Sequence, residues 1–456
     1  MAWFFVLLFL GLIGWLIYFN AVRSEEFINS PYNTRQDTFA DRVIRGSILS
    51  SDGEALALTQ VYDDGTESRT YPYGRIFAHA VGFDSNGKSG LESEANFHLL
   101  SSHAFFLSQM KNEFLGRKNM GDTVVTTLDA GLQSAAWYAL GDRRGAVFAL
   151  EPKTGKIRAM LSRPDFDPNE IEWNWDYLIH DENDSSLLNR ATNGAYPPGS
   201  VFKIVTALDY LRSKGTLDGY SFQCEGQISI DSHTIHCFDY TVHGQEDLPT
   251  AFAYSCNCAF AEIGIDLGAQ SLKNTAEDLL FNRKLPLASY KESVFPLSER
   301  DPVGLIMQTA IGQGDTLVSP AHMALIMSAI ANNGVLMKPQ LIEEIRSSSG
   351  ETVHGYRSAE SQVLLSSDEA SVLQSLLERV VTQGTGYALN GRGYTAAGKT
   401  GSAEFNEEGG SHSWFVGYSN VEDPDLVVAV IIEDGGAGSE SAVPLAASIF
   451  DAYYYG

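Results

Sequence analysis

The stretch GAYPPGSVFKIVTALDYL places Ser200 and Lys203 three residues apart at the start of an apolar segment. The Pro-Pro-Gly run at 197–199 is poor in a helix interior but natural just before one, so we expect a helix to begin near Ser200. Residues i and i+3 share one face of a helix, so the Lys203 amine can reach the Ser200 hydroxyl. A neutral lysine in that place can take the serine proton and activate the oxygen as a nucleophile.

The plainer interpretation is an N-cap serine beside a lysine whose amine extends to solvent. Against it, the predicted helix is apolar nearly all round, which is typical of a buried helix. Burial disfavours the charged amine, and taking a lysine pKa from ~10.4 to near 7 costs about 4–5 kcal/mol of differential solvation. Such a cost is typical of a lysine that serves as a catalytic base. In addition, the N–H groups at the start of the helix point toward any oxyanion formed there.

Two later motifs complete an ordered set. The segment YSCNCAF supplies Ser255 and Asn257, and AAGKTGSAEF supplies Lys399, Thr400, Gly401 and Ser402. Each motif is weak alone, and K-T-G also occurs in PKTGK at 152–156, which we interpret as a structural turn because it precedes Ser200. The ordered triple S-x-x-K, S-x-N and K-T-G is a strong signal for acyl transfer to a serine.

With these motifs the chain resembles the penicillin-binding proteins, and within them the class B transpeptidases, over almost its whole length. The blocks that resemble the family are TTLDAGLQ, GAVFALEPKTGKIRAM, IGQGDTLVSPAHMA and HSWFVGYS, with RGSIL, RTYPYGRIFAHAVG and SGLE in the N-terminal part. One departure is Ser50-Ser51, where the family usually has Asp-Arg. The resemblance implies an α/β fold of α+β type, with a central antiparallel sheet flanked by helices as in the serine β-lactamases, plus an N-terminal pedestal domain.

The resemblance also implies a role for each motif residue. Ser200 is the nucleophile, Lys203 the base for acylation, Ser255 the relay that protonates the leaving amine, and Asn257 the ligand of the substrate amide. Lys399 would hold the S-x-N loop and the substrate carboxylate by charge.

The remaining motif residues would complete the substrate site. The hydroxyls of Thr400 and Ser402 would add hydrogen bonds, and Gly401 would let the backbone approach the substrate closely. The backbone N–H groups of Ser200 and Ser402 would form the oxyanion hole.

Two other functions use or mimic this pattern. A serine β-lactamase or membrane β-lactam sensor shares the triple, but a class A β-lactamase needs a glutamate for deacylation. EDLLFN at 277–282 resembles E-x-x-L-N with the asparagine one position late, so we interpret it as a helix end. The second alternative is a catalytically idle cell-wall scaffold. The presence of all the motif residues argues against it.

Regular elements must position these residues. The region after Val124 predicts a strand, Asp129 as N-cap and a helix to about Leu140. Segments 145–150 and 157–161 predict a β-hairpin. The middle, about 164–390, reads as mostly helical; SWFVGYSN and DLVVAVIIED then predict strands, followed by a terminal helix. Strands at both ends with helices between indicate one sheet built from distant pieces.

The N-terminus differs from the rest of the chain. Residues 1–22 carry no charge and are long enough to predict a transmembrane anchor rather than a cleaved signal peptide. We therefore divide the chain into an anchor at 1–22, a linker and pedestal domain at 23–140, and a transpeptidase domain at 141–456. The net charge of −26 argues against nucleic acid as a partner.

The four cysteines give a weaker signal. Cys224 and Cys237 can form a disulfide outside the cytoplasm. Cys256 and Cys258 form a C-x-C that we interpret as small core residues. No second cysteine or histidine pair stands at metal-like spacing, so neither a metal nor a cofactor is predicted.

Together these observations predict a single-pass protein of the bacterial cell membrane with an extracytoplasmic D,D-transpeptidase domain. Its substrates would be peptidoglycan stem peptides, and β-lactams would inhibit it covalently. No glycosyltransferase domain fits the N-terminal part, so a separate glycan polymerase is the expected partner. The sequence leaves open the acceptor amine, the oligomeric state and a role in elongation, division or sporulation.

Overall fold

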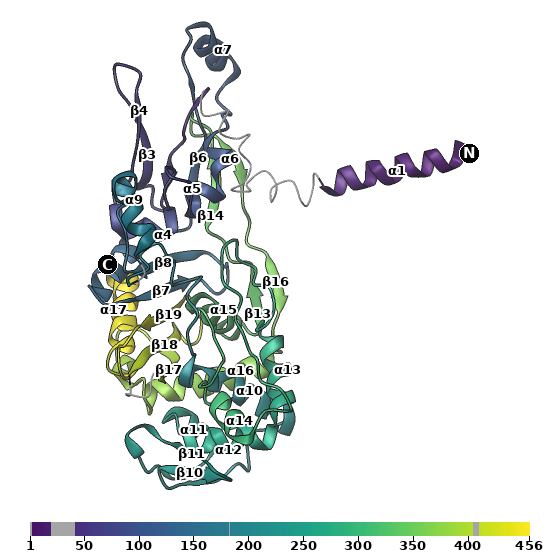
Figure 1. Cartoon of the computed structure of the whole chain (residues 1–456), viewed down its shortest axis with the longest axis vertical. Helices are drawn as coiled ribbons and strands as arrows, with labels where there is room; N and C mark the ends of the chain where they lie inside the picture. The colour runs from purple at the N-terminus through teal and green to yellow at the C-terminus, as the bar shows by residue number, and fades with distance from the viewer. Residues whose placement is uncertain (1, 20–41, 182, 405–409) are drawn as a thin grey trace. The chain divides into compact units, whose positions relative to one another are not determined.

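Two units are built from interleaved parts of the chain (Figure 1). The computed structural model describes residues 2–19, 42–181, 183–404 and 410–456. The first unit consists of Met1–Thr126, Phe166–Tyr177 and Ile342–Tyr356, and the second of Thr127–Asp165, Leu178–Leu341 and Arg357–Gly456.

A five-stranded antiparallel sheet is the centre of the second unit. Its strand order is β17-β18-β19-β7-β8, with bounds Ala396–Glu404, Ser411–Ser419, Leu426–Ile432, Gly145–Leu150 and Ile157–Arg163. Figure 1 shows the early strands β7 and β8 beside the late strands β17 to β19. The predicted hairpin, the two late strands and a sheet assembled from distant pieces are confirmed.

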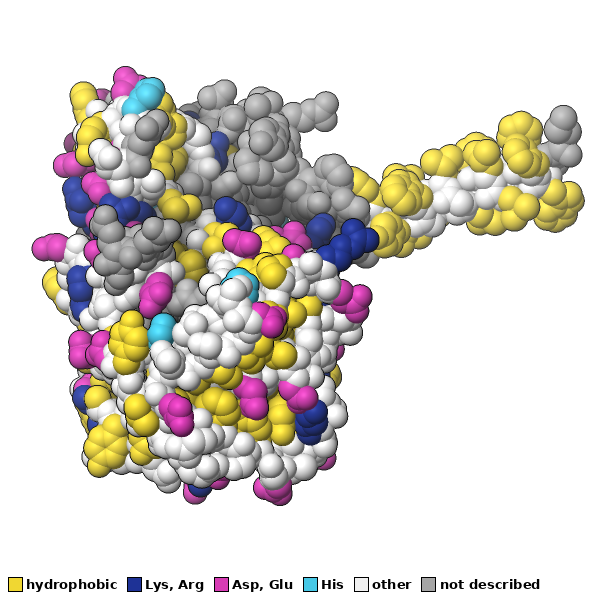
Figure 2. Space-filling model, turned by 60° about the horizontal axis from the view of Figure 1, so that its bottom comes forward, with side chains coloured by type: hydrophobic (Ala, Val, Ile, Leu, Met, Phe, Trp, Pro, Cys, Tyr) yellow, Lys and Arg dark blue, Asp and Glu magenta, His cyan; other side chains and the backbone are white. Residues whose placement is uncertain are grey.

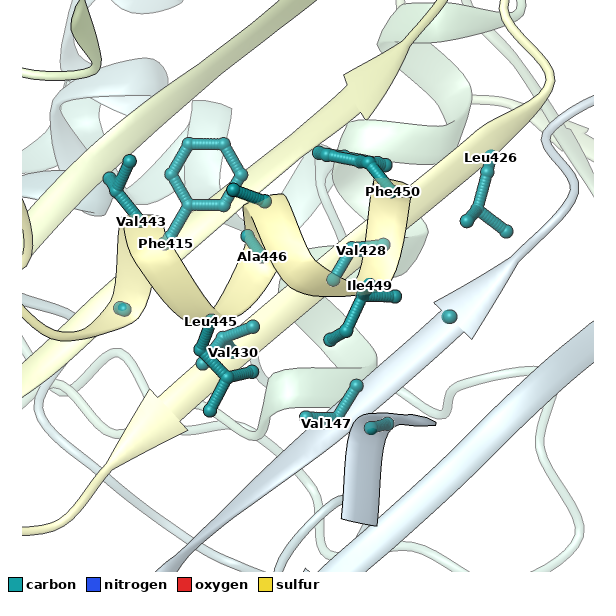
Figure 3. Packing of buried hydrophobic residues seen from close by; sticks show 14 of the residues in the cluster. Val147, Phe415, Leu426, Val428, Val430, Val443, Leu445, Ala446, Ile449 and Phe450 are labelled. Carbon is teal, nitrogen blue, oxygen red and sulfur yellow. The ribbon is translucent and has the colours of Figure 1, made fainter. Parts of the chain in front are cut away.

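Two helices from opposite ends of the unit cover one face of this sheet. They are α8 (Ala130–Leu140), whose first turn is capped by the Asp129 carboxylate accepting from the Leu132 N–H, and α17 (Ala442–Tyr455). Figure 3 shows α17 side chains such as Leu445, Ile449 and Phe450 packed on Val428 and Val430 of β19. This apolar layer fixes the sheet, so the strand β17 that carries Lys399 has a rigid support.

The other face of the same strands is buried against α15 (Pro320–Ala331), all of whose residues are buried. Further helices belong to this unit, as predicted for the middle of the chain, and α16 among them packs on α15. They are α10 (Lys203–Lys214), α11 (Leu248–Ala253), α12 (Asn257–Leu267), α13 (Ala269–Asp278), α14 (Val303–Ala310) and α16 (Ser367–Thr382).

Short strands lie among these helices. Antiparallel pairs form between β10 (Gln227–Ile230) and β11 (His233–His236), β9 (Phe222–Cys224) and β12 (Gly244–Glu246), and β13 (Val335–Met337) and β16 (Glu360–Val363). The first two of these pairs bring the chain between α10 and α11 back toward the start of α12.

The first unit contains a six-stranded mixed sheet. Its order is β15-β14-β6-β2-β3-β4, with bounds Thr352–Gly355, Ile342–Arg346, Thr123–Thr126, Ile48–Leu49, Ala55–Val61 and Glu67–Thr70. Beside it β1 (Val43–Ile44) pairs in parallel with β5 (Asn119–Met120). Its helices are α4 (Ala78–Val81), α5 (Gly90–Glu94), α6 (Asn96–Leu99) and α7 (Phe106–Phe114), and most of α9 (Ile171–His180) also lies here.

A buried ion cluster joins three of the N-terminal sequence blocks. The fully buried Glu92 carboxylate accepts hydrogen bonds from Arg45 at 2.6 Å and Arg69 at 2.7 Å, and the two guanidinium groups hold its pKa low against the effect of burial. Where the chain departs from the family pattern, Ser50 is buried and its hydroxyl oxygen accepts from the Glu54 N–H at 2.9 Å. The serine therefore closes a local turn.

The N-terminal helix α1 spans Ala2–Tyr18, and Figure 2 shows hydrophobic side chains on the visible sides of it. Residues 1 and 20–22 of the predicted anchor lie outside the described residues, as does the whole predicted linker at 23–40. Within the described part of the chain, no helix combines the length and the hydropathy needed to cross a membrane.

Candidate active site

The serine of the S-x-x-K motif lies in a tight turn rather than in the α-helix itself. Residues Gly199–Phe202 form a 3-10 turn, η5, and α10 begins at Lys203. The helix thus begins three residues later than expected. Ser200 is half-buried and its hydroxyl makes no hydrogen bond with the described residues, while no side chain caps either helical segment. The interpretation of Ser200 as an N-cap is therefore wrong.

Lys203 is completely buried, so the interpretation of a lysine extending to solvent is also wrong. Its Nζ donates to the Ser255 carbonyl oxygen at 2.6 Å, to the Ser255 Oγ at 3.2 Å and to the Asn257 Oδ1 at 2.7 Å. None of its hydrogen bonds goes to the Ser200 Oγ, although both residues stand on the first turn. The S-x-x-K and S-x-N motifs, more than 50 residues apart, are thus joined through one amine.

Burial lowers the pKa of Lys203 to about 8. The neighbouring cysteines and Glu246 act in the opposite direction, because negative charge favours the protonated amine. A lysine with such a pKa has a substantial neutral fraction near neutral pH, which a general base requires.

The S-x-N turn has a strained backbone. Ser255 adopts a left-handed conformation with φ of +60°, which is uncommon for a residue with a side chain. Backbone hydrogen bonds to α11 hold it, from the Ser255 N–H to the Phe252 oxygen and from the Cys256 N–H to the Ala251 oxygen. The Asn257 amide nitrogen donates to the His236 carbonyl at 2.9 Å, which leaves its oxygen facing Lys203.

The K-T-G motif lies on β17, at the edge of the five-stranded sheet. Lys399 is fully buried, with its Nζ 3.2 Å from the Thr400 oxygen and 5.5 Å from the centre of the Phe252 ring of α11. Burial and the charge of Lys203 lower its pKa. The Thr400 hydroxyl is hydrogen-bonded to that of Thr385 at 2.6 Å.

The K-T-G strand and the serine turn meet through two glycines. Gly199 has φ of +55°, and a Cβ built there would lie 2.6 Å from the Ser402 carbonyl oxygen. A Cβ at Gly401 would lie 3.1 Å from the Val201 side chain. Only glycine allows this approach, which brings the predicted oxyanion donors Ser200 and Ser402 onto adjoining elements.

Gly199→Ala is expected to lower the rate of acylation by a β-lactam at least about tenfold, because the methyl group pushes η5 away from Ser402 and displaces the oxyanion donors. The measurement is the second-order acylation constant with a fluorescent penicillin. Gly215→Ala is the matched control, since Gly215 also has a left-handed φ of +76° but no atom within 4 Å of the added methyl. Equal rates for both variants would contradict the steric argument.

The structure also places a histidine where the sequence indicated nothing. His243 lies next to three of the four cysteines, all of which are free, so the optional Cys224–Cys237 disulfide is not formed. Cys256 and Cys258 are fully buried, as predicted for small core residues, and the Cys256 sulfur also accepts from the Ala259 N–H at the start of α12. The order Cys, Cys, His, Cys within 224–256 is the only sequence signal for this grouping.

Two models of known protein families match parts of this chain. Residues 145–451 match the family model of the penicillin-binding protein transpeptidase domain, and residues 45–124 match that of the penicillin-binding protein A dimerisation domain. A Mycolicibacterium smegmatis protein named peptidoglycan D,D-transpeptidase PbpA is 33% identical over 86% of this chain and 84% of its own length.

Solved structures agree with the sequence comparison. The D,D-transpeptidase domain of a peptidoglycan glycosyltransferase from Eggerthella lenta has a TM-score of 0.82 at 32% identity, covering 90% of this chain and 98% of that one. The ceftriaxone acyl-enzyme complex of M. tuberculosis penicillin-binding protein A has a TM-score of 0.82 at 28% identity, covering 91% and 99%. The resemblance drawn from the motifs is confirmed, and the chain belongs to the penicillin-binding protein transpeptidase family.

Proposed function

We propose that this chain is a membrane-anchored serine D,D-transpeptidase that cross-links peptidoglycan stem peptides through an acyl-enzyme on Ser200. The observation that carries the proposal is the buried amine of Lys203, held by Ser255 and Asn257 with its pKa lowered to about 8. Burial opposes the charged form of this amine, so its presence between two motif residues fits a general base.

In the acylation step, neutral Lys203 takes the proton of the Ser200 hydroxyl and the oxygen attacks the carbonyl before the terminal D-alanine. The oxyanion is held by the N–H groups of Ser200 and Ser402. The carbon–nitrogen bond then breaks, and Ser255, which is hydrogen-bonded to Lys203, passes a proton to the leaving amine. Lys399 and the hydroxyls beside it bind the substrate carboxylate.

In the second step, an amine of another stem peptide attacks the acyl-enzyme. A new amide forms, the ester bond to Ser200 breaks, and the proton of the amine returns to the serine oxygen through Lys203. A β-lactam follows only the first step, because its leaving nitrogen stays attached to the acyl group and blocks the acceptor. The M. tuberculosis relative has been solved as such an acyl-enzyme with ceftriaxone.

Intact-protein mass spectrometry with penicillin G tests the proposal. One added penicillin per chain that is released slowly supports a transpeptidase, whereas rapid release would indicate a β-lactamase. No labelling at all would indicate an idle scaffold. The segment that resembled a β-lactamase glutamate motif is a helix end, as predicted, since α13 ends at Asp278 and Asn282 binds the backbone of Phe295.

The acylation rate is expected to rise with pH, because only the neutral form of Lys203 accepts the serine proton. Below a pKa of about 8 the rate constant increases by about tenfold per pH unit, and above it the rate levels off. The rate of labelling by fluorescent penicillin between about pH 6 and about pH 9 measures this, with circular dichroism to confirm folding. A flat profile would mean that Lys203 is not the base.

The anchor is proposed from the uncharged apolar sequence of residues 1–22. The transpeptidase would then lie on the outer side of the bacterial membrane, with a separate glycan polymerase as partner. In this proposal residues 1–22 are the anchor, 23–140 the linker and pedestal domain, and 141–456 the catalytic domain. Full-length protein should stay with the membrane fraction after alkaline carbonate washing, and deletion of residues 1–22 should release it. Release of the full-length protein would contradict the anchor.

A further inference from the structure

Three cysteines and a histidine converge beside the S-x-N turn. Cys224 ends β9, Cys237 follows β11, His243 precedes β12, and Cys256 stands before α12. The strands bring them together because β12 pairs with β9, with Gly244 opposite Cys224, while α12 packs on β9 and β11. Figure 1 shows β10, β11, α11 and α12 gathered at one end of the second unit.

The distances within this group match those of a tetrahedral metal site. The Cys237 sulfur lies 3.7 Å from both the Cys224 and Cys256 sulfurs, and the Cys224 sulfur lies 3.5 Å from the His243 Nδ1. All four atoms lie within 4.8 Å of one another. Zinc bonds of about 2.3 Å to sulfur and about 2.0–2.1 Å to nitrogen give tetrahedral edges of about 3.8 Å and about 3.5 Å.

A buried acidic side chain also lies next to the group. Glu246 is 2% exposed, and neither of its oxygens has a hydrogen-bond partner among the described residues. Its side chain lies next to those of His243 and Cys256.

We propose that Cys224, Cys237, His243 and Cys256 bind one structural zinc ion. Three thiolates and one imidazole form a closed Cys₃His set that leaves no position for water, which is typical of structural rather than catalytic zinc. The ligand thiols release their protons to solvent as the ion binds. The three cysteines are buried, so the ion is shielded from solvent on most sides.

The ion would stabilise the active site through Cys256, which stands between Ser255 and Asn257. This residue is the N-cap of α12, and its neighbour Ser255 has a left-handed backbone at the turn that carries both partner residues of Lys203. A zinc bond to the Cys256 sulfur would fix this strained turn. The consequence for acylation rests on the proposed function, whereas the metal content does not.

Metal analysis of the full-length protein, purified in detergent under reducing conditions, tests the site directly. We expect one zinc per chain, lost in Cys224→Ser and in His243→Ala. His236→Ala is the matched control, because His236 is exposed on the same hairpin and outside the ligand set. Zinc that is absent from the wild type, or equal in all variants, would overturn the proposal. So would a Cys224–Cys237 disulfide in the native protein.

Replacement of zinc by cobalt tests the site in the wild-type protein, so its result does not depend on whether a variant folds. Wild-type protein stripped with a chelator and loaded with Co²⁺ should show thiolate-to-cobalt charge-transfer absorption and the bands of a tetrahedral ion, both removed by added Zn²⁺. An octahedral spectrum without thiolate bands would contradict a Cys₃His site.

Penicillin labelling of the stripped protein then tests the link to the active site. We expect the acylation rate to fall by about tenfold or more and to recover when Zn²⁺ is returned. If the zinc-loaded wild type does not label at all, the proposed function fails and the metal site stands. If labelling is normal and no metal binds, the metal site fails and the function stands. An unchanged rate after proven zinc removal would refute the stabilising role.

Discussion

Ser200→Ala is expected to abolish covalent labelling by penicillin without unfolding the protein. The substitution removes the proposed nucleophilic oxygen and little else, because the Ser200 hydroxyl makes no hydrogen bond with the described residues and caps no helix. Loss of an unpaired, half-buried hydroxyl costs little stability. The measurement is intact-protein mass after incubation with penicillin G, alongside thermal unfolding.

Ser448→Ala provides the control, since Ser448 is exposed on α17 and bonds only to its own helix. That variant should label as the wild type does. A Ser200→Ala protein that still gains the mass of one penicillin at the wild-type rate would show that another residue is the nucleophile.

Lys203→Arg is expected to lower the acylation rate by ~10²–10⁴-fold although it keeps the positive charge. Arginine has a pKa above ~12 and cannot accept the serine proton at neutral pH. Its larger planar group must also fit where a fully buried amine now contacts Ser255 and Asn257 at 2.6–2.7 Å. The second-order acylation constant with a fluorescent penicillin measures the loss.

Lys214→Arg, at the exposed end of the same helix, is the control for charge-conserving exchange. Its pair with Asp266 is at the surface, so the change should have almost no effect on stability or rate. Thermal unfolding must show that Lys203→Arg is folded. A folded Lys203→Arg protein that acylates within a few-fold of the wild type would remove the base role from Lys203.

The labelling of Ser200→Ala and the acylation rate of Lys203→Arg together separate the role of Ser200 from that of Lys203. Loss of labelling in Ser200→Ala alone would identify the nucleophile but leave the base open. Loss in both variants, together with a rate that rises toward a pKa of about 8, would assign the proton transfer to Lys203. The proposed zinc site would also affect the Lys203 amine, because Cys256 lies between Ser255 and Asn257, which hydrogen-bond to that amine.

Local sequence patterns predicted several of the regular elements. The hairpin of β7 and β8, the strands β18 and β19, the cap at Asp129 and the terminal helix α17 are all where the patterns predicted them. Such elements depend on turn residues, capping groups and runs of apolar side chains that are neighbours along the chain. The ordered motifs likewise indicated the family before any geometry was known.

Only the tertiary structure decided what the functional side chains touch. The sequence placed Lys203 near Ser200 by helical spacing, but its amine turns to Ser255 and Asn257, and the turn before it is 3-10 rather than α. His243 meets three cysteines because the pairing of β9 with β12 folds the chain back on itself. Contacts between residues far apart in sequence depend on how whole elements pack, and no local period or propensity encodes that packing.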